Sequence, residues 1–369
     1  MTMDWLAALA RLRARGEDCV LVTVADTSGS TPRESGARMV VTARDGWASI
    51  GGGNLEYRAA RRARELLAMD RSNRRVRSER YALGATLGQC CGGHARLLFE
   101  PVAAGAAPIA WIDGLAAALA GECVLATVFA DDGAAADHAV ISDGATHDVI
   151  SASLPEPVVA RARALLGEGR AVRLERLPEG AAPGAGARVL YERLGPPRLK
   201  LVLFGAGHVG HALVAALGDI ECAITWVDAR AELLPENALP RLRVCRGDVP
   251  EQQVDEAPPG SFFLVMTHSH ALDYRLCERI LARGDFAYLG LIGSATKRRR
   301  LEQRLLRKGM SRARIARLTC PIGVAGIHGK HPAEIAVAVA AEILQVRDAA
   351  TVCDSARTIS QERGTAGGE

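Results

Sequence analysis

Lysine and aromatic residues are scarce in this sequence. Only four of the 46 basic residues are lysine, and Phe, Trp and Tyr together make up 4% of 369 residues. Proteins that bind single-stranded nucleic acid stack bases on aromatic side chains, so this scarcity argues against that class. The nine arginines from Arg58 to Arg80 face three acidic residues. We interpret this run as a solvated helix face and expect no nucleic-acid partner.

Long apolar runs and a disulfide framework are also missing. No apolar stretch reaches the roughly 18 residues of a membrane span, and the N-terminal MTMDWLAALARLRARGED mixes charges with helically spaced apolar residues, unlike a secretory signal. The nine cysteines have no framework spacing, which is typical of reduced thiols. We therefore expect a cytoplasmic globular protein with no membrane partner, and the chain length predicts two domains.

Four short segments recur in the same order, which predicts an internal duplication. CVLVTVAD (19–26) resembles CVLATVFAD (123–131), and ARELL (63–67) resembles ARALL (162–166). VRSER (76–80) matches VRLER (172–176), and ARLLFE (95–100) matches ARVLYE (187–192). Copy one then covers about residues 17–100 and copy two about 121–192, each with the order strand, loop, helix, strand, strand.

The two copies differ in their loops, where function usually resides. Copy one has STPRESG, GGGNLE and GQCCGG where copy two has DDGAAAD, SASLPE and APGAG. Cys90 and Cys91 are either accessible soft ligands, suited to a metal or to sulfur transfer, or packed structural thiols. The glycines at 51–53 either let backbone approach an anion or form a tight turn capped by Asn54. Arg33 can clamp a phosphate.

A dinucleotide-binding pattern follows a linker at Gly195-Pro196-Pro197. Gly205, Gly207 and Gly210 lie between an apolar strand and a helix, and Asp228 ends the next strand, at the spacing of that fingerprint. Two further apolar strands, SFFLVMTHSH (261–270) and FAYLGLIGS (286–294), precede a basic helix, KRRRLEQRLLRKG, and an apolar helix that begins near Pro332. This alternation predicts a parallel doubly wound sheet.

Ligands of such sheets bind beyond the carboxyl ends of the strands. Gly293, Ser294 and Lys297 offer backbone N–H groups, a hydroxyl and a cation for a phosphate; the alternative is a loop beside a solvated basic helix. A metal site at His268, His270 and Asp273 is conceivable, but a hydrogen-bonded loop histidine is favoured because neighbouring elements supply no obvious further ligand.

Several long motifs resemble the XdhC/CoxI family of xanthine dehydrogenase accessory proteins. They are STPRESGARMVV, IGGGNLE, LGQCCGG, LVLFGAGHVG, MTHSHALD, LGLIGSATKRRR and PIGVAGIHGKHPAEIAVAVAAEIL, in the family's order over nearly the whole chain. The resemblance implies a non-catalytic chaperone that binds the molybdenum cofactor (molybdopterin), supports its sulfuration by a cysteine desulfurase and inserts it into the molybdenum subunit of xanthine dehydrogenase. A homodimer is expected.

The expected fold class is α/β, in three parts. They are an N-terminal α+β cofactor domain at 1–195, a Rossmann-like domain at 198–347 and a C-terminal tail at 348–369. Within the family motifs, Asn54 and His331 depart from the usual residues. Metal contact is expected from Cys90 and Cys91. The other expected cofactor-binding residues are Gln89, Arg33, Gly51, Gly52, Gly53, Gly205, Gly207, Gly210, Asp228, Ser294 and Lys297.

Two other functional classes stay open. One is an NAD(P)-dependent oxidoreductase that uses the Rossmann site, for which no proton-transfer pair beside a substrate pocket is evident. The other is a regulatory scaffold whose Rossmann domain senses a nucleotide. Fold alone does not decide between these functions and the chaperone.

If NAD or a related nucleotide binds, Asp228 predicts a preference for an unphosphorylated ribose. A carboxylate accepts a hydrogen bond from the 2′-hydroxyl and repels a 2′-phosphate, although Arg230 nearby could weaken the preference. Titration of the protein with NAD and NADP checks this expectation. Tighter binding of NADP would contradict it.

Overall fold

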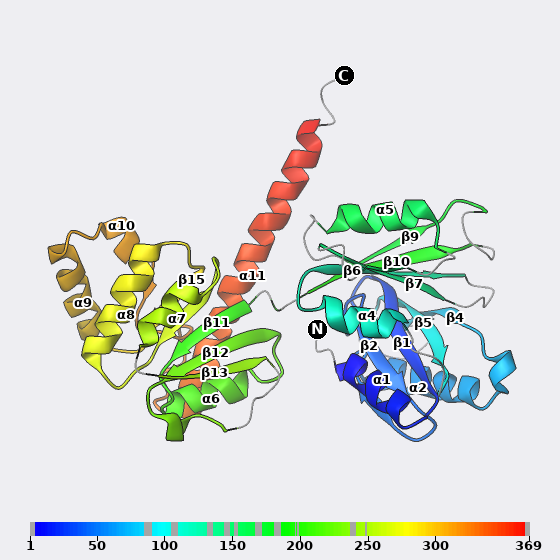
Figure 1. Cartoon of the computed structure of the whole chain (residues 1–369), viewed down its shortest axis with the longest axis horizontal. Helices are drawn as coiled ribbons and strands as arrows, with labels where there is room; N and C mark the ends of the chain where they lie inside the picture. The colour runs from blue at the N-terminus through cyan, green and yellow to red at the C-terminus, as the bar shows by residue number, and fades with distance from the viewer. Residues whose placement is uncertain are drawn as a thin grey trace. The chain divides into compact units, whose positions relative to one another are not determined.

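The chain forms two compact units, Met1–Pro196 and Pro197–Glu369 (Figure 1). The structure is a computed structural model that describes residues 4–84, 91–104, 110–130, 136–143, 148–150, 154–166, 172–180, 186–195, 197, 199–236, 241–247 and 249–365. Within these residues, no helix has both the length and the apolar character needed to cross a membrane.

Two antiparallel five-stranded sheets with one topology make up the N-terminal unit (Figure 1). The strand order is β3-β2-β1-β5-β4 in the first sheet and β8-β7-β6-β10-β9 in the second. The two orders become identical when β6 is matched to β1 and each later strand to its counterpart. This identity confirms the duplication predicted from the four recurring segments.

Each copy contains more secondary structure than its sequence pattern predicts. Copy one comprises α1 (Asp4–Ala14), β1 (Cys19–Ser28), β2 (Arg38–Val41), β3 (Gly46–Ala48), α2 (Gly53–Leu67), the short 3-10 helix η1 (Arg71–Asn73), β4 (Arg77–Ala82) and β5 (His94–Val102). Copy two comprises α4 (Ala110–Ala118), β6 (Cys123–Phe129), β7 (Asp137–Ser142), β8 (Val149–Ile150), α5 (Glu156–Leu165), β9 (Val172–Arg176) and β10 (Arg188–Leu194).

The predicted order of one strand before each long helix is therefore wrong. Two further strands occupy the segment that the pattern treats as a loop, because short buried runs such as Arg38–Val41 pair with the first strand. The repeat also begins earlier than predicted. Trp5 in α1 and Trp111 in α4 hold equivalent places, each followed four residues later by a buried leucine.

Alternate residues of each central strand face different cores, as strand geometry requires. In β1, Val20, Val22 and Val24 pack beneath α2, whereas Leu21 faces the core that both sheets share with α1 and α4. In β6 the same alternation separates the core beneath α5 from the shared core. The N-terminal unit is thus layered in the order α2, first sheet, second sheet, α5.

A buried ion pair joins the two sheets. The Glu192 side chain in β10 is 0% exposed and accepts two hydrogen bonds from the Arg38 guanidinium in β2, one of them 2.8 Å long. The same guanidinium lies 4.6 Å from the centre of the Trp5 ring. Both charges are therefore removed from water, and each depends on the other for compensation.

The equivalent place in the repeat holds a related pair. Glu100 corresponds to Glu192, and His138 corresponds to Arg38 because each lies opposite a threonine of its central strand. His138 Nε2 lies 3.3 Å from Glu100 Oε2, and its ring stacks on Trp111 with 4.2 Å between centroids. The internal two-fold relation thus extends to the polar contacts between the sheets.

The C-terminal unit contains one parallel sheet of six strands, in the order β13-β12-β11-β14-β15-β16. Its elements are β11 (Leu199–Phe204), α6 (His208–Ala216), β12 (Cys222–Asp228), the 3-10 helix η2 (Ala231–Leu233), β13 (Leu242–Arg246), α7 (Pro250–Glu256), β14 (Phe262–Val265), α8 (His270–Arg283), β15 (Tyr288–Leu291), α9 (Ala295–Arg307), α10 (Arg312–Ile315), β16 (Leu318–Thr319) and α11 (Pro332–Thr365). The order confirms the doubly wound Rossmann-like sheet, whose strand order reverses between β11 and β14.

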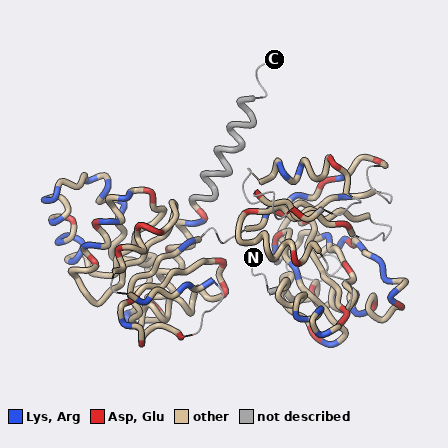
Figure 2. The backbone as a smooth tube through the Cα atoms, viewed as in Figure 1, with Lys and Arg blue, Asp and Glu red and all other residues tan. Residues whose placement is uncertain are grey.

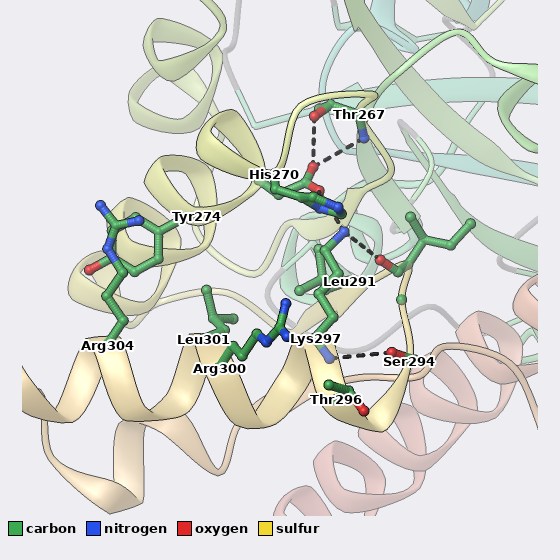
Figure 3. Close-up of a pocket in the computed structure, with 13 residues that line it drawn as sticks. Thr267, His270, Tyr274, Leu291, Ser294, Thr296, Lys297, Arg300, Leu301 and Arg304 are labelled. Atoms are coloured by element: carbon green, nitrogen blue, oxygen red, sulfur yellow. Dashed lines mark hydrogen bonds and ion pairs between the residues drawn. The ribbon is translucent and has the colours of Figure 1, made fainter.

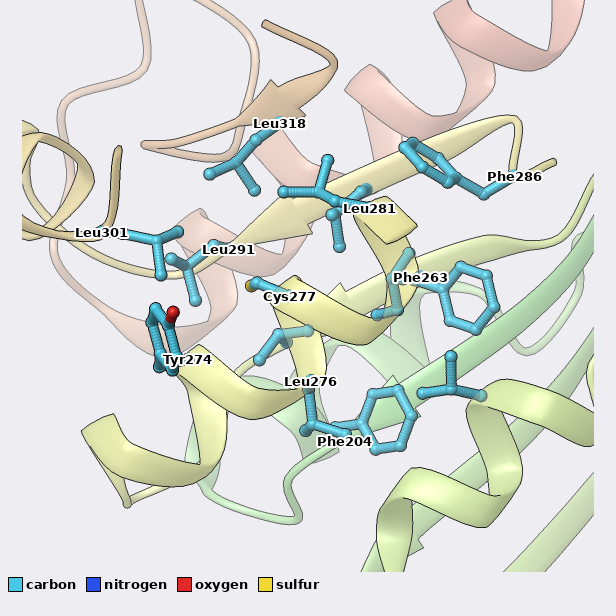
Figure 4. Close-up of a cluster of buried hydrophobic side chains, with 14 of the residues drawn as sticks. Phe204, Phe263, Tyr274, Leu276, Cys277, Leu281, Phe286, Leu291, Leu301 and Leu318 are labelled. Atoms are coloured by element: carbon cyan, nitrogen blue, oxygen red, sulfur yellow. The ribbon is translucent and has the colours of Figure 1, made fainter. Parts of the chain in front are cut away.

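Helices cover both faces of this sheet. Side chains of α6 and α11 pack on one face, and those of α7, α8, α9 and α10 pack on the other. Figure 4 shows the second core, in which Phe204 and Phe263 of the strands meet Leu276 and Leu281 of α8. The helix α11 continues to Thr365, through the residues that the sequence pattern sets apart as a tail.

We expect Arg38→Met to lower the free energy of unfolding of the N-terminal unit by about 3–5 kcal/mol, because it leaves the Glu192 charge buried without a partner. The double variant Arg38→Met with Glu192→Leu removes both charges and should recover most of that loss. Urea unfolding, monitored by hydrogen exchange of the backbone amides in β2 and β10, measures the loss in the single variant and the recovery in the double variant.

Arg61→Met provides a control. Arg61 is 65% exposed and pairs with Glu65 on the surface of α2, where a salt bridge is worth about 0.3–0.5 kcal/mol. A double variant as unstable as Arg38→Met alone would show that uncompensated charge is not the cause of the loss.

Candidate functional site

The special loops of copy one meet in the structure. Segment 28–33 lies between the other two loops: the Gly93 N–H donates to the Ser30 carbonyl over 3.0 Å, and a Cβ on Gly51 would lie 2.7 Å from Pro32 Cβ and 3.2 Å from Arg33 Cγ. The fold therefore brings together Arg33, the glycine turn and the Cys91–Gly93 segment. Gln89 and Cys90 lie outside the described residues.

Glu56 organises the glycine turn. Gly51, Gly52 and Gly53 all have positive φ, at 121°, 71° and 62°. Glu56 Oε2 accepts hydrogen bonds from the Ser49 hydroxyl at 2.6 Å and from the N–H groups of Ile50 and Gly52 at 3.0 Å each. This carboxylate thus occupies donors that an anionic ligand would otherwise use.

The N-terminus of α2 differs from the predicted tight turn in one respect. Gly52, and not Asn54, is the N-cap residue. A Cβ on Gly52 would meet no atom within 4 Å, so the backbone there borders open space. Close approach of a ligand to the turn is therefore possible at Gly52, whereas Gly51 is required by the contact with Pro32.

Cys91 and Arg33 supply the chemistry of this region. Cys91 is half-buried, whereas Cys19 and Cys123 of the same unit are fully buried, and burial raises the pKa of both of those thiols to about 12. Arg33 is exposed and has no ion pair or hydrogen bond among the described residues. A half-buried thiol, which packs against the core beneath α2, and an unmatched guanidinium thus lie on neighbouring loops.

No three His, Cys, Asp or Glu side chains of the described residues come close enough together to hold a metal ion. This holds for the region of His268, His270 and Asp273, where Asp273 instead binds Lys297 and Thr267. Because Cys90 lies outside the described residues, metal contact by Cys90 and Cys91 stays a prediction.

In the C-terminal unit, the three fingerprint glycines have separate roles. Gly205 has φ of 112°, and a Cβ there would lie 2.3 Å from the Met266 carbonyl oxygen. A Cβ on Gly210 would lie 2.5 Å from the Gly205 carbonyl oxygen, so this residue allows α6 to pack against the turn. Gly207, the N-cap of α6, borders open space. These are the roles that a dinucleotide-binding turn needs.

Asp228 is already saturated with hydrogen bonds. Its Oδ2 accepts from the Ala206 N–H at 2.6 Å and from Arg230 Nη2 at 2.8 Å, and its Oδ1 accepts from Arg230 N and Nε. Burial raises the pKa of Asp228, but these hydrogen bonds outweigh it and lower the pKa to about 2. A ribose hydroxyl would have to displace Arg230, so the ribose preference stays a prediction.

A cavity of about 600 Å³ in this unit lies beside α9 (Figure 3). Asp273, 1% exposed, closes one side: its Oδ1 accepts from the Thr267 hydroxyl at 2.7 Å, and its Oδ2 accepts from Lys297 Nζ at 2.6 Å. Lys297 Nζ also donates to the Ile292 carbonyl at 2.8 Å. The carboxyl ends of β14 and β15 are thereby tied to α8 and α9.

The predicted phosphate cradle is therefore partly occupied by the protein itself. Ser294 is the N-cap of α9 and its hydroxyl accepts from the Lys297 N–H at 3.3 Å. Two of the three donors on the Lys297 ammonium bind protein oxygens. A smaller cavity of about 110 Å³, lined by Gly205 and Asp228, shares Thr267 with the larger one.

Two protein-family models match this chain, one in each of its two units. Residues 201–343 match the XdhC Rossmann domain model, and residues 12–80 match the XdhC and CoxI family model. The chain belongs to the XdhC family. The matches cover the glycine turns of both units and Arg33, whereas Cys90 and Cys91 lie outside both matched ranges.

Two curated relatives and one solved structure are similar to this chain. The uncharacterized protein YqeB of Escherichia coli K12 is 34% identical over 155 residues, which are 41% of this chain and 28% of that protein. A probable xanthine dehydrogenase subunit of Bacillus subtilis 168 is 28% identical over 153 residues, 41% of this chain and 44% of that protein. The matched stretch therefore spans less than half of either relative.

A crystal structure described as a xanthine dehydrogenase from Bacillus halodurans superposes with a TM-score of 0.69. It is 21% identical in sequence, and the match covers 94% of this chain and 96% of that chain. At this identity the likeness establishes a shared fold over both units.

We expect Gly51→Ala to lower the melting temperature more than Gly52→Ala. Both residues have positive φ, which costs an alanine about 1–2 kcal/mol. At Gly51 the new methyl group would also overlap Pro32, which adds roughly 1–3 kcal/mol. Thermal unfolding of the two variants measures the difference, and equal shifts would show that segment 28–33 does not pack on the turn.

Proposed function

We propose that this protein is an accessory factor that holds the molybdenum cofactor for a xanthine dehydrogenase. Family membership and the similarity to a protein named as a probable component of xanthine dehydrogenase support this role. The observation that carries it is the meeting of three loops in copy one. These loops place a half-buried thiol, an unmatched guanidinium and a glycine, Gly52, that borders open space in one region.

The residues of this region fit the chemical character of the cofactor. When bound, the cofactor supplies molybdenum held by dithiolene sulfurs, together with a phosphate on the pterin. Thiolates are preferred ligands of soft metals, which suits Cys91 and, by the family motif, Cys90. A guanidinium binds phosphate through two parallel hydrogen bonds, which suits Arg33. Gly52 leaves room for the backbone to approach a flat ring.

Copy two supports the proposal by contrast. It has the same sheet order and the same shared core as copy one, but its sequence lacks the two cysteines, the arginine loop and the triple glycine. We infer that copy two stabilises the unit and that copy one binds the cofactor. We propose that the protein also supports sulfuration of the cofactor by a cysteine desulfurase, acts as a homodimer and delivers the cofactor to the molybdenum subunit.

Reconstitution of apo-xanthine dehydrogenase with molybdenum cofactor, with and without this protein, tests the proposed function. We expect faster and more complete recovery of xanthine oxidation in its presence. Unchanged recovery at any ratio of the two proteins would contradict the accessory role. Hydride transfer to NAD by this protein alone would instead favour the oxidoreductase alternative.

We expect Cys91→Ser, and more strongly the double variant with Cys90→Ser, to reduce bound molybdenum at nearly unchanged melting temperature. Serine is close in size to cysteine, but its oxygen is a poorer ligand for a soft metal. If Cys91 were instead a packed structural thiol, an unpaired buried hydroxyl would cost about 1–3 kcal/mol and lower the melting temperature.

Cys245→Ser is the matched control, because Cys245 is also half-buried but lies in the C-terminal unit. It should leave molybdenum content unchanged. Elemental analysis and thermal unfolding of all variants supply both readings. Full molybdenum occupancy in the double variant would end the proposal that these thiols bind the metal.

A further inference from the structure

The cavity beside α9 carries positive charge that no neighbouring carboxylate neutralises. Lys297, Arg300 and Arg304 line it, and Asp273 is the acidic residue among its lining. Asp273 is buried and paired with Lys297 at 2.6 Å, so this pair is compensated internally. The charges of Arg300 and Arg304 are left over.

Arg300 is the side chain of this set that is best placed for a ligand. Figure 3 shows it between the pair of Arg304 and Tyr274 at one end of the cavity and Lys297 at the other. Arg300 is exposed and has no hydrogen bond or ion pair to any described residue. A guanidinium offers five donors in a planar fork and no acceptor, a geometry that matches phosphate.

Arg304 is held differently. Its guanidinium lies 3.6 Å from the centre of the Tyr274 ring, and Lys308 Nζ lies 5.4 Å from the same centre. Tyr274 is 4% exposed, so this aromatic ring fixes a cation at the end of the cavity. The lining therefore has a fixed cation, Arg304, on one side and Lys297 on the other, with Arg300 between them (Figure 3).

The rest of the lining is mixed: it contains three aliphatic residues and the polar side chains of Thr267, His270, Ser294 and Thr296. The aliphatic residues are Leu291 and Ile292 at the end of β15 and Leu301 of α9. A volume of about 600 Å³ lies in the range of small-molecule sites, which commonly combine apolar walls with a few polar groups. The ligand that suits this combination is an organic molecule with one strongly anionic group.

We propose that this cavity binds an organic phosphate, with the phosphate on Arg300 and the rest of the molecule against Leu291, Ile292 and Leu301. The proposal does not rest on the proposed function, because no residue of the Arg33 and Cys91 region lines this cavity. The cavity is also distinct from the glycine turn, since its lining meets that of the smaller cavity only at Thr267. The phosphate can come from a nucleotide or from a phosphorylated pterin.

Calorimetric titration of the full-length protein with AMP, NAD and a monophosphorylated pterin tests the site, with inorganic phosphate as the common reference. We expect saturable binding of inorganic phosphate and tighter binding of at least one organic phosphate. Arg300→Ala should weaken the tighter ligand by about tenfold or more, as expected for a lost charge-assisted hydrogen bond. Arg300→Lys should restore only part of the affinity.

Arg299→Ala is the matched control. Arg299 is the neighbouring exposed arginine on α9 and does not line the cavity, so the variant changes the helix charge equally and should leave the affinity unchanged. Equal losses in Arg299→Ala and Arg300→Ala would overturn the proposal and show general attraction to the basic helix (Figure 2). Absence of binding by any phosphate probe would also overturn it, whatever the outcome of xanthine dehydrogenase reconstitution.

Discussion

Two glutamates between stacked sheets, Glu192 fully buried and Glu100 with a side chain 12% exposed, constrain the whole N-terminal unit. Glu100 and Glu192 end the last matching segments of the repeat, and both face the shared interior. A buried carboxylate is tolerated only with a partner, and in each case the partner comes from the other copy. The two copies therefore stabilise each other, because separation of the sheets would expose the shared core and leave the polar groups of both pairs without partners.

This arrangement leaves the strand ends free to diverge. The apolar core positions and the glutamates recur in both copies, whereas the loop sequences differ. Comparison of the two copies therefore singles out from sequence the loops of Arg33, Gly51 and Cys91, which the structure brings together; their function stays a prediction. The contact of Gly51 with Pro32 and the capture of turn N–H groups by Glu56 could not be predicted, because both depend on how segments distant in sequence meet.

The C-terminal unit shows the same division between what local pattern determines and what packing adds. Glycine spacing and strand alternation determine the backbone of the turn and the sheet, and both predictions are confirmed. A motif does not reveal how the hydrogen-bonding capacity of its side chains is used. Asp228 binds Arg230 two residues later, and Lys297 binds Asp273 from another helix. Residues chosen as ligand contacts by spacing thus serve partly to hold the carboxyl edge of the sheet together.

In an arginine-rich chain, an arginine without an ion-pair partner is a better indication of a binding site than a dense run of arginines. In the segment from Arg58 to Arg80, Arg62 pairs with Glu79 and Arg74 pairs with Asp18, so a dense run of arginines need not bind anything. Arg33 and Arg300 differ, because neither has a partner among the described residues and each lies beside open space. Internal pairing absorbs the cations that build the fold, and the cations left over beside a glycine turn or a cavity are the ones that a ligand can use.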